Sequence, residues 1–215
     1  MKDGRRGLLV VVEGIDGTGK TTLARRLTER LTEQGIPCLL TFEPTMGAYG
    51  SRLRESFVGH RRLHPDEELD LFTRDRHGHV EETILPALSR GEVVICDRYY
   101  FSTMAYQGAR GRDPEEIRRI NEAFAPRPDL VLLLDLDPAS AVERIRKKRG
   151  EVPNNFEEIG YLERVADIFR SLEDAVILRL DGRLPEDALL EQAWDAVLAR
   201  INRRGPDPRP SEDRS

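Results

Sequence analysis

Short apolar runs alternate along the chain with longer stretches whose apolar residues recur every three or four positions. The runs cover residues 8–12, 36–42, 92–96, 129–134 and 175–180. Their length is typical of buried strands. The longer stretches have helical spacing and cover residues 19–34, 50–58, 66–90, 99–107, 138–149, 156–172 and 185–203, with one more beginning at residue 114. This alternation predicts an α/β fold with a five-stranded parallel sheet and helices on both faces.

Glycines and prolines mark the ends of several of these elements. Gly35 and Gly91 follow predicted helices, whereas Pro114 and Pro138 occupy the first helical position, where a missing N–H costs least. A chain of 215 residues suits a single domain, which we expect over residues 1–203. Residues 204–215 carry three prolines and mixed charge, so we expect a disordered tail there.

A glycine-rich loop directly follows the first apolar run and fits the pattern G-x-x-x-x-G-K-[ST]. Its residues are Gly14, Ile15, Asp16, Gly17, Thr18, Gly19, Lys20 and Thr21. In a strand-loop-helix setting, such a loop holds a polyphosphate with backbone N–H groups and the positive end of the helix dipole. Lys20 would reach the β- and γ-phosphates and Thr21 would bind Mg²⁺. The alternative is a glycine turn without a ligand.

Carboxylates follow two further predicted strands, at the edge of the sheet where ligands bind in α/β folds. Asp97 ends the third strand and suits an acidic residue on the metal side of a phosphoryl-transfer site, although it could also cap a helix. Asp135 and Asp137 follow the fourth strand. Because Asp137 precedes a proline that opens a helix, we assign both of these residues a structural role.

An arginine lies within the apolar face of the long helix predicted at residues 66–90. Arg76 is four residues from Phe72 and four from Val80, so the three share one sector of the helix. A buried guanidinium is costly without an anionic partner. The partner is either a protein carboxylate or a ligand. Arg74 and Asp75 point elsewhere, and we expect both to be solvated.

Two more patterns are candidate parts of a site. Arg98, Ser102 and Tyr106 recur every four residues, which places a cation, a hydroxyl and a phenol on one flank of a helix. They form either a pocket wall or an ordinary helix face. Residues 144–149 hold five cations, which form either a solvated helix or, with the loop that follows, a lid at about residues 144–156 over the phosphates.

Composition narrows the class of protein. The net charge of −5 provides no general attraction to nucleic acid or anionic membranes, and no run approaches the roughly 20 apolar residues of a membrane span. Cys38 and Cys96 both fall in predicted strands, which favours reduced thiols in a cytoplasmic protein. The four histidines, at positions 60, 64, 77 and 79, are interpreted as non-catalytic.

Four segments together resemble the thymidylate kinases. They are residues 13–22, Glu43-Pro44, the pair Phe72 and Arg76, and above all the run at residues 97–108, Asp-Arg-Tyr-Tyr-Phe-Ser-Thr-Met-Ala-Tyr-Gln-Gly. The likeness spans about residues 7–200. It implies a three-layer P-loop kinase fold, a cytoplasmic homodimer and transfer of the γ-phosphoryl group of ATP to dTMP, with Mg²⁺, in dTTP biosynthesis.

The resemblance also implies a role for each matching residue. Lys20 and the loop amides would hold ATP, while Thr21 and Asp97 would serve Mg²⁺. Asp16 would bind the 3′-hydroxyl of the acceptor. The rest of the acceptor site would come from Phe72 and Arg76 at the base, Arg98 and Arg54 at the phosphate, and Glu43, Ser102, Thr103, Tyr106 and Gln107, of which Tyr106 would favour deoxyribose. Arg144 and Lys148 would bind ATP, and the catalytic residues would be Lys20, Asp16, Arg98, Arg146 and Arg149.

The chain departs from the family pattern at several positions. Phe42 stands where an arginine is frequent, residues 45–47 replace Gly-Gly-Thr, and Asn154-Asn155 replaces Asp-Arg after the lid helix. Because Thr18 leaves the phosphate loop without an arginine, charge for the transition state would come from residues 144–149. Two alternatives stay open: a kinase of the same architecture for another nucleotide or a nucleoside, and a non-enzymatic nucleotide-binding protein.

Overall fold

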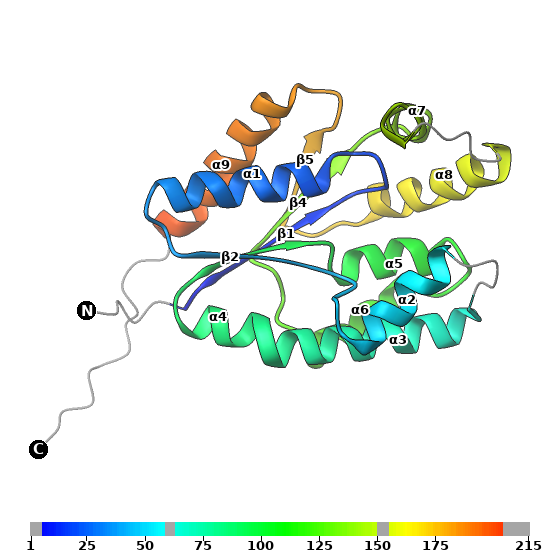
Figure 1. The fold of residues 1–215 in the computed structure, drawn as a ribbon, viewed down its shortest axis with the longest axis horizontal. Coiled ribbons are helices and arrows are strands. Elements are labelled where there is room, and N and C mark those ends of the chain that lie inside the picture. Colours follow the sequence, from blue (N-terminus) through cyan, green and yellow to red (C-terminus); the bar gives the residue numbers. More distant parts are fainter. Residues whose placement is uncertain (1–5, 59–62, 150–154, 204–215) are drawn as a thin grey trace, which may run out of the picture.

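A single parallel sheet forms the centre of the molecule. The computed structural model describes residues 6–58, 63–149 and 155–203, so the expected tail at residues 204–215 lies outside the described part. The strands are β1 (Leu8–Glu13), β2 (Cys38–Phe42), β3 (Val93–Asp97), β4 (Leu130–Asp135) and β5 (Ile177–Asp181). They run in the order β2-β3-β1-β4-β5 (Figure 1) and every pairing is parallel. The predicted α/β fold is confirmed.

Helices connect each strand to the next. They are α1 (Lys20–Glu33), α2 (Ala48–Val58), α3 (Pro65–His79), α4 (Leu85–Ser89), α5 (Tyr100–Gly108), α6 (Pro114–Glu122), α7 (Pro138–Arg149), α8 (Asn155–Ser171) and α9 (Glu186–Arg203). Their bounds agree with the predicted ones to within a few residues. None of the helices in the described ranges is long and apolar enough to cross a membrane. Cys38 and Cys96 are both free.

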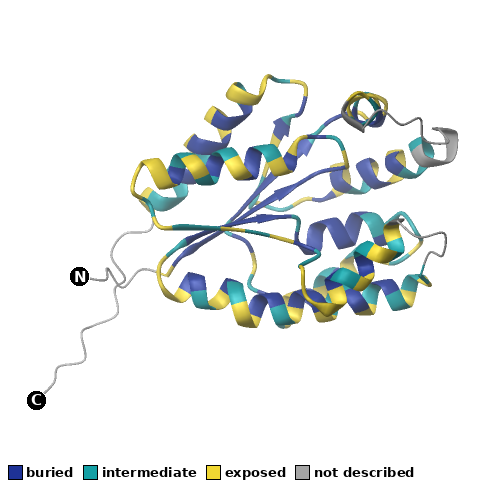
Figure 2. Cartoon of the chain, viewed as in Figure 1, coloured by how far each residue is buried: buried dark blue, intermediate teal, exposed yellow. Residues whose placement is uncertain are grey.

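Alternate residues of each strand enter two separate cores. Val10 of β1 and Ile95 of β3 pack with α1 and α9, whereas Leu9 of β1 and Val94 of β3 pack with α4, α5, α6 and α8. Figure 1 shows α1 and α9 on one side of the sheet and the other set on the opposite side, and Figure 2 shows the central strands buried between them. Because both faces are covered there, the central strands β1, β3 and β4 are apolar up to their last residue instead of alternating with polar residues, whereas the edge strands β2 and β5 include Thr41 and Arg179.

The long helix predicted at residues 66–90 is continuous but contains a π-helical turn at Val80–Ile84. Pro86 has no N–H to donate to the carbonyl one turn earlier. The chain widens instead, and the Leu85 N–H bonds to the Val80 carbonyl. The proline is thus accommodated without ending the helix.

Asp75 of this helix is not solvated, so that expectation was wrong. It is buried, and it accepts hydrogen bonds from the backbone N–H and the hydroxyl of Thr45, at 2.7 and 2.6 Å. Arg74 is exposed as expected and pairs with Asp70. Asp75 therefore fixes the loop that joins β2 to α2, on which Glu43 lies.

Candidate functional site

The phosphate loop joins the end of β1 to the start of α1. Gly19 precedes the first residue of α1 and has a φ of 96°, a conformation that favours glycine. At Gly17, φ is 85° and a Cβ atom would lie 2.4 Å from the Ala141 carbonyl oxygen of α7. Glycine is thus required at both positions. The first N–H groups of α1 have no partner within the helix, which makes its start an anion-binding site.

Lys20 lies beneath this loop, where it is almost fully buried. Its Nζ donates to the Ile15 carbonyl at 2.7 Å, which keeps the side chain folded back along the loop. Burial and the positive charge of Arg98 lower the pKa of Lys20 to about 8. The loop is therefore an anion site whose charge changes within a biochemically accessible pH range.

A cavity of about 650 Å³ opens beside the loop, a volume that suits a nucleotide. The loop forms one side, and Arg98 and Arg144 also line it. Six further lining residues were not predicted from the sequence: Arg26, Arg183, Leu184, Pro185, Glu186 and Leu189. Four of them, residues 183–186, directly follow β5. A signal was available, because ligands bind at the carboxyl ends of all strands in such a sheet, and β5 is one of them.

Thr21 and Asp97 meet at the floor of the site. The Thr21 hydroxyl donates to Asp97 Oδ2 at 2.5 Å, and Asp97 Oδ1 is a buried acceptor with no partner among the described residues. Asp97 does not cap α5, which begins with Tyr99 as its N-cap residue. An unpaired carboxylate oxygen beside a hydroxyl oxygen is a donor set that suits Mg²⁺ and its bound waters. The residues present therefore fit the metal.

Arg98 connects the phosphate loop to α5. Its Nη2 donates to Asp16 Oδ1 at 2.6 Å, its Nη1 donates to the Ser102 hydroxyl at 2.9 Å, and its guanidinium lies 5.2 Å from the centre of the Tyr106 ring. Arg98, Ser102 and Tyr106 therefore lie together, although Arg98 precedes α5 and only Ser102 and Tyr106 belong to the helix. Desolvation raises the pKa of Asp16, but the charges of Arg98 and Lys20 outweigh it and hold that pKa at about 2. Asp16 is thus a permanent acceptor.

Glu13 anchors the start of α5 from the end of β1. Its Oε1 accepts from the backbone N–H groups of Tyr99 and Ser102, at 2.8 and 3.1 Å, and its Oε2 accepts from the Ser102 hydroxyl at 2.5 Å. Burial raises the pKa of Glu13 to about 7, although Ser102 and Arg98 act to lower it. Glu13 was not assigned a role from the sequence, yet a carboxylate at the end of an apolar strand was a usable signal.

Arg76 is fully buried, and its partners belong to the protein. Its Nε donates to Glu43 Oε2 at 2.8 Å, its Nη1 to Asn121 Oδ1 at 2.5 Å and its Nη2 to the Thr103 hydroxyl at 3.0 Å. Of the two partners left open by the sequence, the protein carboxylate is the one observed. Phe72, one turn earlier, is half-buried, and its ring lies 6.3 Å from that of Phe57.

Gln107 lies one turn after Thr103 on α5 and is also buried. Its Oε1 has no hydrogen-bond partner among the described residues. A buried acceptor without a partner is costly unless a ligand supplies the donor. Because residues four apart share one face of a helix, this oxygen lies on the same face of α5 as the hydroxyl that contacts Arg76.

The remaining predicted residues are less closely grouped. Arg54 donates to the carbonyls of Pro44 and Thr45, so it braces the loop after β2. On α7, Arg144 lines the cavity, and Arg146 is half-buried with its Nε unpaired among the described residues. The side chains of Lys148 and Arg149, like residues 150–154 of the expected lid, lie outside the described part. Asp137 caps α7 through the Ser140 N–H, and Asp135 pairs with Arg170. Both are structural, as predicted.

Comparison with known proteins identifies the family to which the chain belongs. The sequence model of the thymidylate kinase family matches residues 12–193. A thymidylate kinase of Xanthomonas oryzae pv. oryzae is 49% identical over 195 residues, which are 91% of this chain and 85% of that protein. That of Xanthomonas campestris pv. campestris is 48% identical with the same coverage. That of Desulfotalea psychrophila is 46% identical over 176 residues, 82% of this chain and 87% of its own. The chain belongs to the thymidylate kinase family.

Proposed function

We propose that this kinase uses the described site to transfer the γ-phosphoryl group of ATP to dTMP, which gives dTDP and ADP. Membership of the thymidylate kinase family supports the assignment of this reaction. The geometry supports the assignment of the two nucleotides to the two halves of the site. ATP enters the cavity of about 650 Å³ beside the phosphate loop, and dTMP lies along α5 toward Phe72 and Arg76.

On the donor side, the loop amides and Lys20 bind the phosphates of ATP. Arg144 and the segment 183–186 line the same cavity and enclose the rest of the nucleotide. Thr21 and Asp97 would hold Mg²⁺, which when bound neutralises charge on the phosphate oxygens. Arg146 supplies further positive charge from α7.

On the acceptor side, Arg76 and Gln107 recognise the pyrimidine. Thymine presents a carbonyl oxygen at C4 and an N–H at N3. Arg76 offers donors, and Gln107 Oε1 is a buried acceptor without a partner, so a donor and an acceptor match that edge. Cytosine reverses both groups and would be rejected. Phe72 stacks on the ring, Asp16 binds the 3′-hydroxyl, and Tyr106 closes the sugar side.

The reaction needs positioning and positive charge more than proton transfer. The attacking oxygen of dTMP is already anionic, so no general base is required. Arg98 holds the acceptor phosphate next to the phosphate loop, because it lines the donor cavity while it bonds Asp16 and Ser102. This bridging by one guanidinium is the observation that carries the proposal, since it brings both phosphates to one point.

An acceptor panel tests the proposal. ADP release is measured with dTMP, dUMP, dCMP and thymidine for the unmodified chain and for Arg76→Ala. We expect dTMP to be preferred and Arg76→Ala to raise the KM for dTMP about tenfold or more, with the KM for ATP nearly unchanged, because a buried hydrogen bond from a charged group is lost. Arg74→Ala is the matched control on the same helix and should change neither constant. Unchanged acceptor kinetics in Arg76→Ala, or faster turnover of dCMP or thymidine, would contradict the assignment.

We also propose that the protein acts as a homodimer in the cytoplasm. Exposed apolar side chains along β2 and the start of α2 support association of two copies, and two free thiols support a reducing compartment. These side chains are Leu40, Phe42, Met46 and Tyr49. Light scattering after size-exclusion chromatography should give twice the chain mass; a monomer at micromolar concentration would contradict the dimer.

A further inference from the structure

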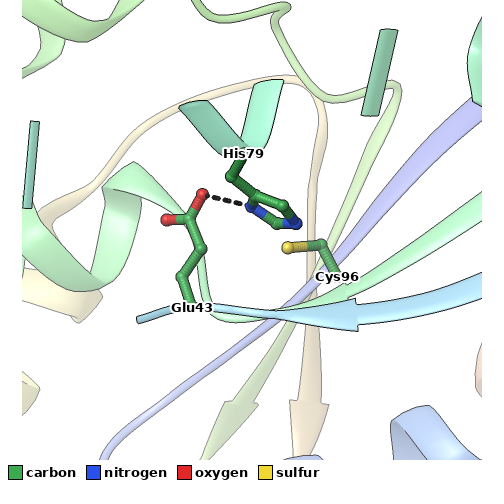
Figure 3. A group of neighbouring side chains, drawn as sticks. All are labelled: Glu43, His79 and Cys96. Atoms are coloured by element: carbon green, nitrogen blue, oxygen red, sulfur yellow. Dashed lines mark hydrogen bonds and ion pairs between the residues drawn. The ribbon is translucent and has the colours of Figure 1, made fainter. Parts of the chain in front are cut away.

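Three buried side chains lie together, and one of them, Glu43, contacts Arg76. Glu43 follows β2, His79 ends α3 and Cys96 belongs to β3, and one ligand atom of each lies within 4.8 Å of the others. Figure 3 shows His79 directed at the Glu43 carboxylate, with the Cys96 sulfur beside the ring. The proposed reaction uses neither His79 nor Cys96, so their arrangement calls for an explanation of its own.

A metal ion does not account for the group. His79 Nε2 is paired with the Thr41 hydroxyl at 2.6 Å, the Cys96 thiol donates to the Arg98 carbonyl at 3.0 Å, and both oxygens of Glu43 are bonded. A metal would have to break each of these contacts. Burial also raises the pKa of the Cys96 thiol well above its usual range, so the thiolate that binds metals is disfavoured.

The hydrogen bonds instead form a chain that runs from Thr41 through His79 and Glu43 to Arg76. A carboxylate only accepts, so His79 Nδ1–H donates to Glu43 Oε1, at 3.0 Å. The other ring nitrogen, Nε2, is hydrogen-bonded to the Thr41 hydroxyl at 2.6 Å. Held in this way, Glu43 presents its Oε2 to Arg76, to Nε at 2.8 Å and to Nη2 at 2.7 Å. The orientation of the His79 ring thereby fixes the carboxylate that orients the guanidinium.

Asn121 of α6 holds the other side of the same guanidinium. Its Oδ1 accepts from Arg76 Nη1 at 2.5 Å, and its Nδ2 donates to the Ile117 carbonyl at 2.7 Å, which fixes the direction of the amide. With Thr103 and Glu43, these hydrogen bonds engage three of the five N–H groups of Arg76 and leave one on Nη1 and one on Nη2, and Nη2 also forms an ion pair with Glu43 Oε2. The guanidinium also lies over the Tyr99 ring, at 5.3 Å.

We propose that His79 and Asn121 are positioning residues that preset Arg76, so that an N–H without a hydrogen bond among the described residues meets the C4 carbonyl of the pyrimidine. The inference rests on the proposed role of Arg76 in binding the base. It makes the selection of a carbonyl over an amino group at C4 depend on two side chains that do not touch the base. A fixed N–H of Arg76 would face the C4 amino group of cytosine, so that two donors meet and cytosine is disfavoured. A guanidinium that is free to turn could avoid this repulsion and would lose the discrimination.

Two amide substitutions at one position separate positioning from simple packing. His79→Asn places an amide N–H near the position of Nδ1 and keeps the bond to Glu43. His79→Gln reaches the position of Nε2 and keeps the bond to Thr41 instead. We expect His79→Gln to raise the KM for dTMP about tenfold, equal to about 1.4 kcal/mol, and to lower the ratio of kcat/KM for dTMP over dCMP. His79→Asn should stay within about twofold of the unmodified chain, because the bond to the carboxylate is retained.

Further measurements make the result decisive. Asn121→Leu should reproduce the effect of His79→Gln, the KM for ATP should stay constant in all variants, and the exposed His77→Asn on the same helix should change nothing. If His79→Gln and His79→Asn raise the KM for dTMP equally, or neither alters the dTMP to dCMP ratio, the positioning role is overturned. If Arg76→Ala also leaves dTMP kinetics intact, the proposed function fails as well; an effect of Arg76→Ala alone refutes only the inference.

Discussion

The charge of Glu13 gives a quantitative test of how the site is built. Its carboxylate is fully buried and accepts three hydrogen bonds from α5. Burial raises its pKa from about 4.5 to about 7. The folded chain therefore binds this proton more tightly than the unfolded chain does, and the free energy of unfolding falls as the pH rises between the two values.

The magnitude follows from the two pKa values. Each pH unit between them is worth about 1.4 kcal/mol, so charging Glu13 costs about 3 kcal/mol of stability above pH 7, a cost that is absent below pH 4.5. Glu13→Gln cannot be charged. Its amide oxygen can still accept from Tyr99 and Ser102, while its NH₂ group changes the contact with the Ser102 hydroxyl by an amount that does not depend on pH.

Urea unfolding from pH 5 to pH 8 measures this difference. The single tryptophan, Trp194, is buried between α9 and the sheet and reports unfolding by fluorescence. The unfolding free energy of Glu13→Gln minus that of the unmodified chain should grow by about 2 to 3 kcal/mol over this range. The exposed Glu186→Gln is the control and should show a constant difference. A difference for Glu13→Gln that stays constant between pH 5 and 8 would refute the assignment of a raised pKa to Glu13.

Two further predictions concern the donor side. Because the pKa of Lys20 is about 8, ATP binding above that pH requires Lys20 to take up a proton. The KM for ATP should therefore rise above pH 8, with a slope that approaches about tenfold per pH unit. Steady-state kinetics that show a constant KM for ATP up to pH 9.5 would contradict this prediction. Thr21→Val removes the hydroxyl beside Asp97 and should raise the Mg²⁺ concentration for half-maximal rate about tenfold, with the KM for dTMP unchanged; an unchanged Mg²⁺ titration would exclude Thr21 as a ligand, and the exposed Thr32→Val serves as the control.

The sequence predicted most of the architecture because its signals are local. Apolar runs define the strands, Gly35 and Gly91 end helices, and Pro114 and Pro138 begin them. Ser102 and Tyr106 lie on one flank of α5, as their spacing by four residues predicts, whereas Arg98 precedes the helix and reaches Ser102 from outside it.

What the sequence could not predict depends on partners that are distant along the chain. Helical spacing placed Asp75 away from the apolar face, but its partner Thr45 lies on another segment, 30 residues earlier. Whether Arg76 pairs with a carboxylate or a ligand was open for the same reason, since Glu43 precedes it by 33 residues. His79 was interpreted only as non-catalytic and Asn121 was given no role, because the function of a buried histidine or asparagine depends on neighbours that are distant along the chain.

The backbone at Arg98 explains why the two halves of the site cannot be separated. Arg98 is the one non-glycine residue with positive φ, 69°, in the described chain, and such a conformation costs about 1 to 2 kcal/mol. Its N–H bonds to the Val12 carbonyl, while the next N–H, from Tyr99, turns to Glu13. These two bonds tie the strained residue to β1 on both sides, directly before the phosphate loop. The strain is thus stabilised by the same strand that leads into the phosphate loop. A substitution at Glu13 should consequently move Arg98, the proposed ligand of the dTMP phosphate, as well as the start of α5. Its effect on the KM for dTMP should exceed its effect on the KM for ATP.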